Sequence, residues 1–251
     1  GGESGTARAG RLVVPTCGDL WREGARPRAL YGGWSGLALV AGGSEIFVNL
    51  SASPFGLGKP ATRREMVGAL ARTTERPIVY CNVVGGNDEL VFDGNSIAFN
   101  AAGELIGQLP AFATGEAIVE TGATAALAPL SCEPMAELHG ALSLGVRDYL
   151  AKCHFKSAVL GLSGGIDSAV VAALAVDSLG KENVVGVSMP SPYSSPGSIE
   201  DAHALARNLG IRCLDVPIGD ALPAFKAQFE KAFAGRPEDT TEENMQSRLR
   251  G

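Results

Sequence analysis

The sequence predicts an α/β protein built in two parts. Residues 157–218 alternate between short apolar strands and helices, whereas residues 11–120 are strand-rich with helical interludes. Between them, residues 121–133 form a stretch of small residues without periodicity, where we place the domain boundary. Strand–helix alternation implies right-handed crossovers and a parallel sheet. With 251 residues, 45% of them hydrophobic, the chain can bury one large core or two smaller ones.

The first part combines apolar strands with one amphipathic helix. The segment TRREMVGALARTTE has helical spacing, with Met66, Val67 and Leu70 on one face and charges opposite. The turn signals GGND, DGN and AAGE that follow predict further strands and hairpins. The apolar runs predict strands at 11–16, 45–53 and 76–84.

The second part begins with a helix that has Pro134 near its first turn. A regular alternation follows, in which both helices end in glycine, a normal carboxyl-terminal signal. A last helix begins at TEENMQSRLRG. The expected strands are 157–163, 183–190 and 211–218, and the expected helices are 134–155, 165–180, 198–210 and 241–251.

Charge and cysteine content exclude several classes of protein. The formal net charge of −6 argues against nucleic-acid binding, which needs clustered Lys and Arg. No apolar run reaches the roughly 18 residues that indicate a membrane span. The cysteines form no CxxC pair and suggest neither a zinc site nor a disulfide framework, so we expect a cytoplasmic protein. The five are Cys17, Cys81, Cys132, Cys153 and Cys213.

The loop GLSGGIDS stands between a predicted strand and a predicted helix. Its glycines let the backbone approach a ligand, and the first helical amides offer donors to phosphate. The carboxylate of Asp167 suits Mg²⁺, which binds carboxylate together with phosphate oxygens. The lysine of the Walker A loop is absent, although the loop is built to hold phosphate. The predicted ATP-binding residues of the loop are Gly161, Leu162, Ser163, Gly164, Gly165, Ile166, Asp167 and Ser168.

The SGGxDS pattern resembles the PP-loop of the ATP pyrophosphatases, which implies AMP transfer rather than γ-phosphoryl transfer. The segments FKSAVLGLSGGIDSAVVAALAVDSLG, NVVGVSMPSPYSSPGSIEDAHALARNLGI and TEENMQSRLRG resemble NAD synthetase. The segments CGDLW, VNLSASPFGLGK and GGNDELVFDGNS resemble the nitrilase-type glutaminase domain that is fused to that synthetase. Together the two sets resemble the glutamine-dependent NAD synthetase family and cover nearly the whole chain.

The resemblance implies the fold and the reaction. Residues 1–125 would be the C-terminal part of a nitrilase-like αββα glutaminase domain. Residues 126–251 would be the first half of a parallel-sheet PP-loop domain, similar to adenine nucleotide α-hydrolases. Glutamine hydrolysis would supply ammonia, ATP with Mg²⁺ would adenylate deamido-NAD⁺, and ammonia would displace AMP to give NAD⁺ and pyrophosphate. The resemblance also implies a homo-oligomer, no cofactor beyond ATP and Mg²⁺, and an enzyme of the carbon–nitrogen ligase class.

The resemblance also implies individual roles. Cys17 would be the nucleophile that attacks the glutamine amide, and Ser53 and Lys59 would contact glutamine. Asp167 would bind Mg²⁺. Ser188 and Met189 would lie where the adenine binds, and Asn244 and Arg248 would contact deamido-NAD⁺.

The chain also departs from the family pattern. The family motif is usually CEDLW, whereas Gly18 here replaces the carboxylate beside the nucleophile. The Glu and Lys of the nitrilase triad are expected well before the cysteine, and later synthetase blocks are expected after SRLRG. We therefore expect an internal fragment of a longer enzyme that is inactive alone. Three alternatives stay open: another PP-loop amidotransferase such as GMP or asparagine synthetase, an ammonia-dependent NAD synthetase with a relic amidase domain, and a non-catalytic nucleotide-binding chain.

Overall fold

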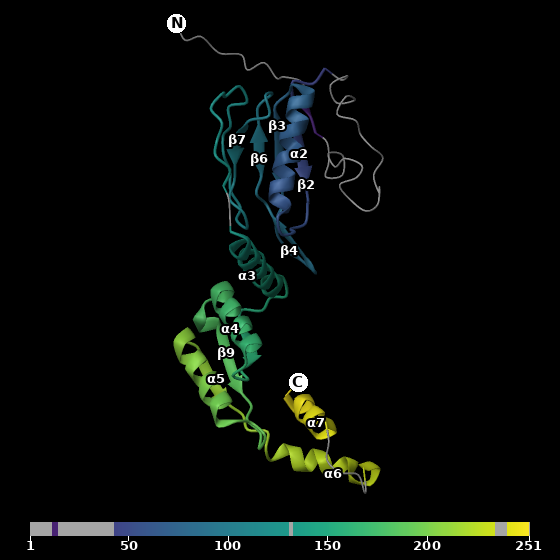
Figure 1. Cartoon of the computed structure of the whole chain (residues 1–251), viewed down its shortest axis with the longest axis vertical. Helices are drawn as coiled ribbons and strands as arrows, with labels where there is room; N and C mark the ends of the chain where they lie inside the picture. Colours follow the sequence, from purple (N-terminus) through teal and green to yellow (C-terminus); the bar gives the residue numbers. More distant parts are fainter. Residues whose placement is uncertain (1–11, 15–42, 131–132, 234–239, 251) are drawn as a thin grey trace. The chain divides into compact units, whose positions relative to one another are not determined.

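The protein is an α/β protein, as predicted, and its computed structural model describes residues 12–14, 43–130, 133–233 and 240–250. The chain divides into two compact units, Gly1–Asp148 and Tyr149–Gly251. Figure 1 shows the helices and strands of both units. None of the helices within the described ranges is long and apolar enough to cross a membrane.

The first unit is organised around a mixed five-stranded sheet of order β1-β2-β3-β6-β7. The first three strands run parallel, β6 pairs antiparallel with β3, and β7 pairs antiparallel with β6. A separate two-stranded hairpin pairs β4 with β5. The strands are β1 (Leu12–Val13), β2 (Ile46–Ser51), β3 (Ile78–Asn82), β4 (Val84–Asn87), β5 (Leu90–Asp93), β6 (Ile97–Phe99) and β7 (Leu105–Gln108).

Helix α2 (Lys59–Thr74) packs along this sheet (Figure 1). Val67 is fully buried, and Met66 and Leu70 pack against the same core, as their spacing predicts. The prediction that the charged side chains of this helix lie opposite its apolar face is wrong for Arg63, which is only 1% exposed. Arg63 stands one helical turn before Val67 and therefore shares its face. The core comprises Phe47, Val67, Ala71, Ile78, Tyr80, Ile97, Phe99 and Leu105.

The inner face of the sheet changes from apolar to polar along the parallel strands. Residues Phe47, Asn49 and Ser51 alternate inward on β2, and Asn49 and Ser51 stand opposite Tyr80 and Asn82 of β3. The carboxyl ends of parallel strands meet at one edge of a sheet, so buried polar side chains gather at that edge. This is where sheets of this kind place ligands.

Helix α3 (Pro134–Lys152) begins at the proline that predicted it. The carboxylate of Glu133 accepts hydrogen bonds from the amides of Met135 and Ala136 at its start. The division between the compact units falls inside α3, after Asp148, whose carboxylate accepts a 2.8 Å hydrogen bond from the Gly86 amide. The domain boundary at 125/126 stays a prediction.

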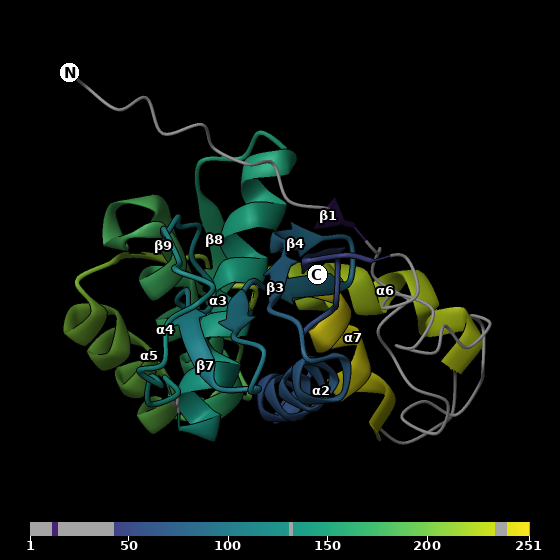
Figure 2. The same ribbon diagram turned by 90° about the horizontal axis from the view of Figure 1, so that it is seen from above.

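The second unit is a three-stranded parallel sheet of order β10-β9-β8 with helices α4 and α5 in its crossovers. Figures 1 and 2 show α4 and α5 side by side along β9, and their alanines Ala172, Ala175, Ala202 and Ala206 form the buried contact with the sheet. Gly180 and Gly210 end these helices, as predicted. Helix α6 was not predicted. The elements are β8 (Ala158–Gly161), α4 (Ile166–Leu179), a 3₁₀ turn (Lys181–Asn183), β9 (Val184–Ser188), α5 (Pro196–Leu209), β10 (Arg212–Asp215), α6 (Ala221–Phe233) and α7 (Thr240–Arg250).

Candidate functional site

The glycine-rich loop lies between β8 and α4, as the sequence predicts. Gly164 has φ +78°, a left-handed conformation that glycine adopts at little cost. A Cβ at this position would overlap the backbone carbonyl oxygen of Ser198, at the start of α5. The loop therefore needs glycine at 164 both for its backbone angle and for the close approach of α5.

Two serine hydroxyls close the loop on itself. Ser163 Oγ accepts a 3.2 Å hydrogen bond from the Gly165 amide, and Ser168 Oγ donates a 2.9 Å hydrogen bond to the Gly165 carbonyl. The two hydroxyl oxygens are 3.1 Å apart. Gly165 is at the N-cap position of α4 and has no side chain that could bond the first helical amides. The first turn of α4 therefore presents the unpaired amides and positive dipole end that favour phosphate.

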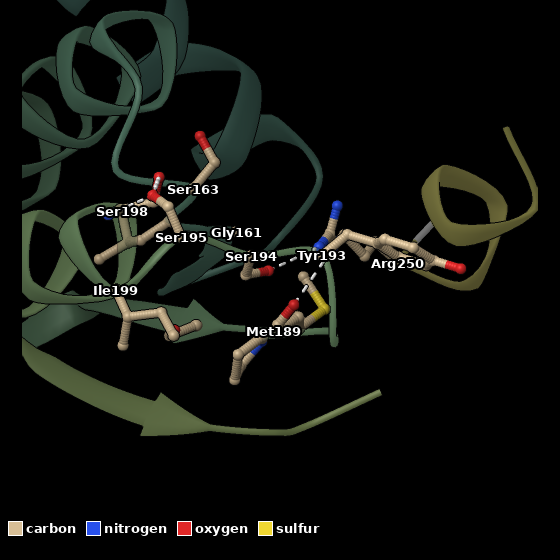
Figure 3. Close-up of a pocket in the computed structure, with 12 residues that line it drawn as sticks. Gly161, Ser163, Met189, Tyr193, Ser194, Ser195, Ser198, Ile199 and Arg250 are labelled. Carbon is tan, nitrogen blue, oxygen red and sulfur yellow. Dashed lines mark hydrogen bonds between the residues drawn. The ribbon is translucent and has the colours of Figure 1, made fainter. Parts of the chain in front are cut away.

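A cavity of about 560 Å³ opens beside this loop at the carboxyl ends of β8 and β9 (Figure 3). Ser188, the last residue of β9, is buried, and the Met189 side chain packs close to the Gly161 backbone. The cavity is large enough for a nucleotide-sized ligand. The residues that line it are Gly161, Leu162, Ser163, Ser188, Met189, Pro190, Tyr193, Ser194, Ser195, Ser198, Ile199 and Arg250.

The wall of the cavity includes residues that the sequence prediction did not assign. Ser195 caps α5, with its Oγ accepting a 3.1 Å hydrogen bond from the Ser198 amide. Arg250 of α7 donates hydrogen bonds to the Met189 carbonyl (3.2 Å) and to Ser194 Oγ (3.5 Å), as drawn in Figure 3. The sequence SPYSSPGS does indicate a helix start at these serines, because Ser before Pro is typical of one. Nothing local to Arg250 distinguishes it from Arg248.

The remaining predicted residues of this unit lie outside the cavity wall. Asp167 is exposed in the first turn of α4, and Asn244 and Arg248 are exposed on α7. Across the described ranges, no three His, Cys, Asp or Glu side chains group closely enough to hold a metal ion. A single carboxylate beside a phosphate loop is still a sufficient protein contribution for Mg²⁺, which takes its other ligands from phosphate and water.

In the first unit, Ser53 and Lys59 lie at the two ends of the loop that joins β2 to α2. Ser53 is fully buried, and its hydroxyl makes no hydrogen bond to any residue that the structure describes. Lys59 begins α2 and donates a 2.6 Å hydrogen bond to the Pro54 carbonyl. Cys17 lies outside the described residues, as does Gly18.

A buried ion pair stands beside this loop and was not predicted. The Arg63 guanidinium donates two hydrogen bonds to the Asp93 carboxylate, at 2.9 and 3.1 Å. It also lies 5.6 Å from the centre of the Tyr80 ring. Both charged side chains are at most 1% exposed. In the sequence, Asp93 belongs to a DGN turn signal, which does not indicate that its carboxylate forms a buried ion pair.

Three cysteines fall within the described residues, and none was assigned a role. Burial raises the pKa of the Cys81 thiol. Burial, and then the nearby Asp215 carboxylate, raise the pKa of the Cys213 thiol, against a smaller opposing effect of a hydrogen bond with the Ser188 backbone. Thiols with raised pKa values carry little thiolate at neutral pH, which makes both poor nucleophiles. Cys153 is exposed.

Comparisons with known proteins show what the chain is similar to. Residues 138–251 match the family model "NAD synthase". The chain is similar to the glutamine-dependent NAD(+) synthetases of Synechocystis sp. (44% identical over 248 residues, 96% of this chain and 44% of the relative) and Thermotoga maritima (38% over 278 residues, 96% and 47%). It is also similar to the solved structure of the glutamine-dependent NAD+ synthetase from Acinetobacter baumannii in complex with ADP. That match has a TM-score of 0.82 and 34% identity, and covers 98% of this chain and 46% of the other. The chain thus spans about half the length of the relatives it matches.

Proposed function

The chain belongs to the glutamine-dependent NAD(+) synthetase family, and on that premise we propose that the protein makes NAD⁺ from deamido-NAD⁺, ATP and glutamine. One observation carries the proposal: Gly161, Leu162 and Ser163, which lead into the start of α4, line a cavity at the carboxyl ends of β8 and β9. This arrangement holds phosphates through backbone amides and hydroxyls without a lysine. It therefore suits a reaction in which pyrophosphate leaves and AMP is transferred.

In this proposal, residues 126–251 form the synthetase domain. The loop from Gly161 to Ser168 binds the ATP phosphates, and Ser188 and Met189 bind the adenine. Mg²⁺, held by Asp167 and phosphate oxygens, would neutralise charge on the phosphates during adenylation. Asn244 and Arg248 contact deamido-NAD⁺ from α7. The exposure of Asp167 and of both α7 residues leaves each side chain available for such contacts.

Residues 1–125 form the glutaminase domain in this proposal. In the sequence, Cys17 follows β1, which runs parallel to β2, and β2 leads to Ser53. The Cys17 thiolate would attack the glutamine amide and release ammonia. The buried Ser53 hydroxyl, unsatisfied among the described residues, offers a polar contact to glutamine, and Lys59 lies at the far end of the same loop. We further propose that the protein is cytoplasmic and acts as a homo-oligomer.

NAD⁺ formation with two nitrogen donors tests the proposal. We expect the protein expressed from its complete natural gene to make NAD⁺, AMP and pyrophosphate with either glutamine or ammonium chloride. The variant Cys17→Ala should lose glutamine-dependent synthesis and keep ammonium-dependent synthesis, whereas Cys153→Ala, at an exposed cysteine, should keep both. Use of ammonium alone by the unaltered protein would contradict the glutaminase assignment, and no NAD⁺ from either donor would contradict the whole proposal.

A further inference from the structure

The loop between β2 and α2, residues 52–58, carries no regular structure, yet it is attached to the fold at several points. The Phe55 amide donates a 2.6 Å hydrogen bond to the Val91 carbonyl of β5. Lys59 donates to the Pro54 carbonyl. These bonds hold the middle of the loop. Its beginning, at Ser53, is held by different contacts.

Asn82 provides that attachment from the end of β3. Its Oδ1 accepts a 2.8 Å hydrogen bond from the Ser53 amide, and its Nδ2 donates to the Ser53 carbonyl at 3.3 Å. The side-chain amide of Asn82 therefore binds both backbone groups of Ser53, as a neighbouring strand would. Because Asn82 is itself only 8% exposed, water competes little for these bonds.

The Arg63–Asp93 ion pair determines which way the Asn82 amide points. Asn82 Nδ2 lies 3.4 Å from Asp93 Oδ1. An ionised carboxylate only accepts hydrogen bonds, so it requires the NH₂ end of the Asn82 amide to face it. The Oδ1 end is then left for the Ser53 amide. Arg63 holds the Asp93 carboxylate in place through its two hydrogen bonds.

We propose that Asn82, oriented by Asp93 and Arg63, is a positioning residue that sets the Ser53 hydroxyl for glutamine. This inference rests on the proposed function, since it takes Ser53 as a glutamine contact. Asn82, Asp93 and Arg63 need not touch glutamine themselves. Their effect is transmitted through the backbone of Ser53, whose own hydroxyl is buried and has no hydrogen-bond partner within the described residues.

The variant Asn82→Ala removes both bonds to Ser53 and leaves the ion pair intact. We expect its KM for glutamine to rise about five- to tenfold, the factor that losing hydrogen bonds between uncharged groups produces. Its synthesis of NAD⁺ from ammonium should be unchanged, which a general loss of structure would not allow. Asp93→Asn is the second variant, because it frees the Asn82 amide to turn over and should raise the same KM.

Asn100→Ala is the matched control. Asn100 is also a buried asparagine that holds a turn, since its Oδ1 accepts hydrogen bonds from the Ala102 and Glu104 amides. It lies at the other end of the sheet, because its neighbour Phe99 pairs with Ile78 at the start of β3. If Asn82→Ala and Asn100→Ala have equal KM values for glutamine in a protein that uses glutamine, the inference is overturned.

Amide hydrogen exchange separates this inference from the proposed function. We expect the Ser53 amide to exchange about tenfold faster in Asn82→Ala than in the unaltered protein, and at an unchanged rate in Asn100→Ala. If the unaltered protein does not use glutamine, the glutaminase assignment fails, while faster exchange still supports the positioning by Asn82. Unchanged exchange at Ser53 would overturn the positioning whatever the nitrogen donor.

Discussion

At the scale of single residues, Gly164 shows how a local motif depends on a distant neighbour. Its left-handed φ is predictable from a glycine-rich turn, but the overlap with Ser198 is visible only in the folded unit. Both features act on the same position. A side chain at 164 must change the backbone angle and also move the start of α5.

The substitution Gly164→Ala should therefore destabilise the protein by about 1–3 kcal/mol and weaken ATP binding. The control Gly197→Ala adds a Cβ with no neighbour within 4 Å and no left-handed φ, so it should leave both unchanged. Urea unfolding and ATP titration of the two variants measure these effects. Equal ATP affinity in both variants would contradict the assigned role of the loop.

Cys213 gives a prediction on pH dependence. The negative charge of Asp215 adds to burial in raising the pKa of the Cys213 thiol. A raised thiol pKa lowers the thiolate fraction at any pH below it, so Cys213 should react slowly with iodoacetamide at pH 8. Asp215→Asn should lower that pKa and speed the reaction, whereas Asp201→Asn, at an exposed position on α5, should not. Peptide mass spectrometry of the labelled protein measures the rate at this cysteine, and equal rates in the two variants would exclude the effect of the charge.

Some residue-scale features were beyond prediction from the sequence. Arg63 and Asp93 are 30 positions apart. Local context alone predicts Arg63 to be a surface charge on a helix and Asp93 to be a turn residue. Their pairing depends on how α2 packs against the sheet. The pKa directions of Cys81 and Cys213 depend in the same way on burial and on charges brought near by folding.

At the scale of elements, the periodic segments were predicted well. The strands at 158–161, 184–188 and 212–215 and the helices at 166–179 and 196–209 match expectation to within a few residues. Helix α6 was not predicted. Its segment contains Pro223, and the low helical propensity of proline argues against a helix, although proline is tolerated in a first turn.

Helix α5 supplies the prediction at this scale. Ser195 caps it through the Ser198 amide, so Ser195→Ala should destabilise the protein by about 1 kcal/mol. The control Ser178→Ala lies inside α4, where its hydroxyl bonds back to the Leu174 carbonyl. A hydroxyl in that position contributes little, and alanine is the better helix former, so this variant should be neutral or slightly stabilised. Urea midpoints compare the two, and equal midpoints would contradict the importance of the cap.

At the scale of the whole molecule, the proposed sites for glutamine and for ATP lie in different compact units. Ser53 and Lys59 belong to the first unit, and the loop 161–168 with its cavity belongs to the second. Substitutions in the two units should therefore have different consequences for the two nitrogen donors. A defect in glutamine hydrolysis affects one donor, whereas a defect in adenylation affects both.

The variant Asp167→Asn should reduce NAD⁺ synthesis from glutamine and from ammonium by the same factor, because adenylation precedes either reaction. Because the Asp167 carboxylate is proposed to bind Mg²⁺ beside the phosphates, we also expect this variant to need more Mg²⁺ for half-maximal activity. The exposed Asp177→Glu substitution on α4 keeps its charge and serves as the control. Loss of activity with only one donor would contradict the assignment of Asp167 to the ATP site.

The sequence by itself determined the α/β class, the parallel arrangement of the second unit and the loop 161–168. Each of these depends on periodicity, turn residues and spacing, which are properties of residues close together in the sequence. Only the tertiary structure decided that Arg63 pairs with Asp93, that Asn82 holds Ser53, and that Arg250 rather than Arg248 borders the cavity. These contacts join residues far apart in the sequence, and they form because packing of the helices on their sheets brings particular faces together.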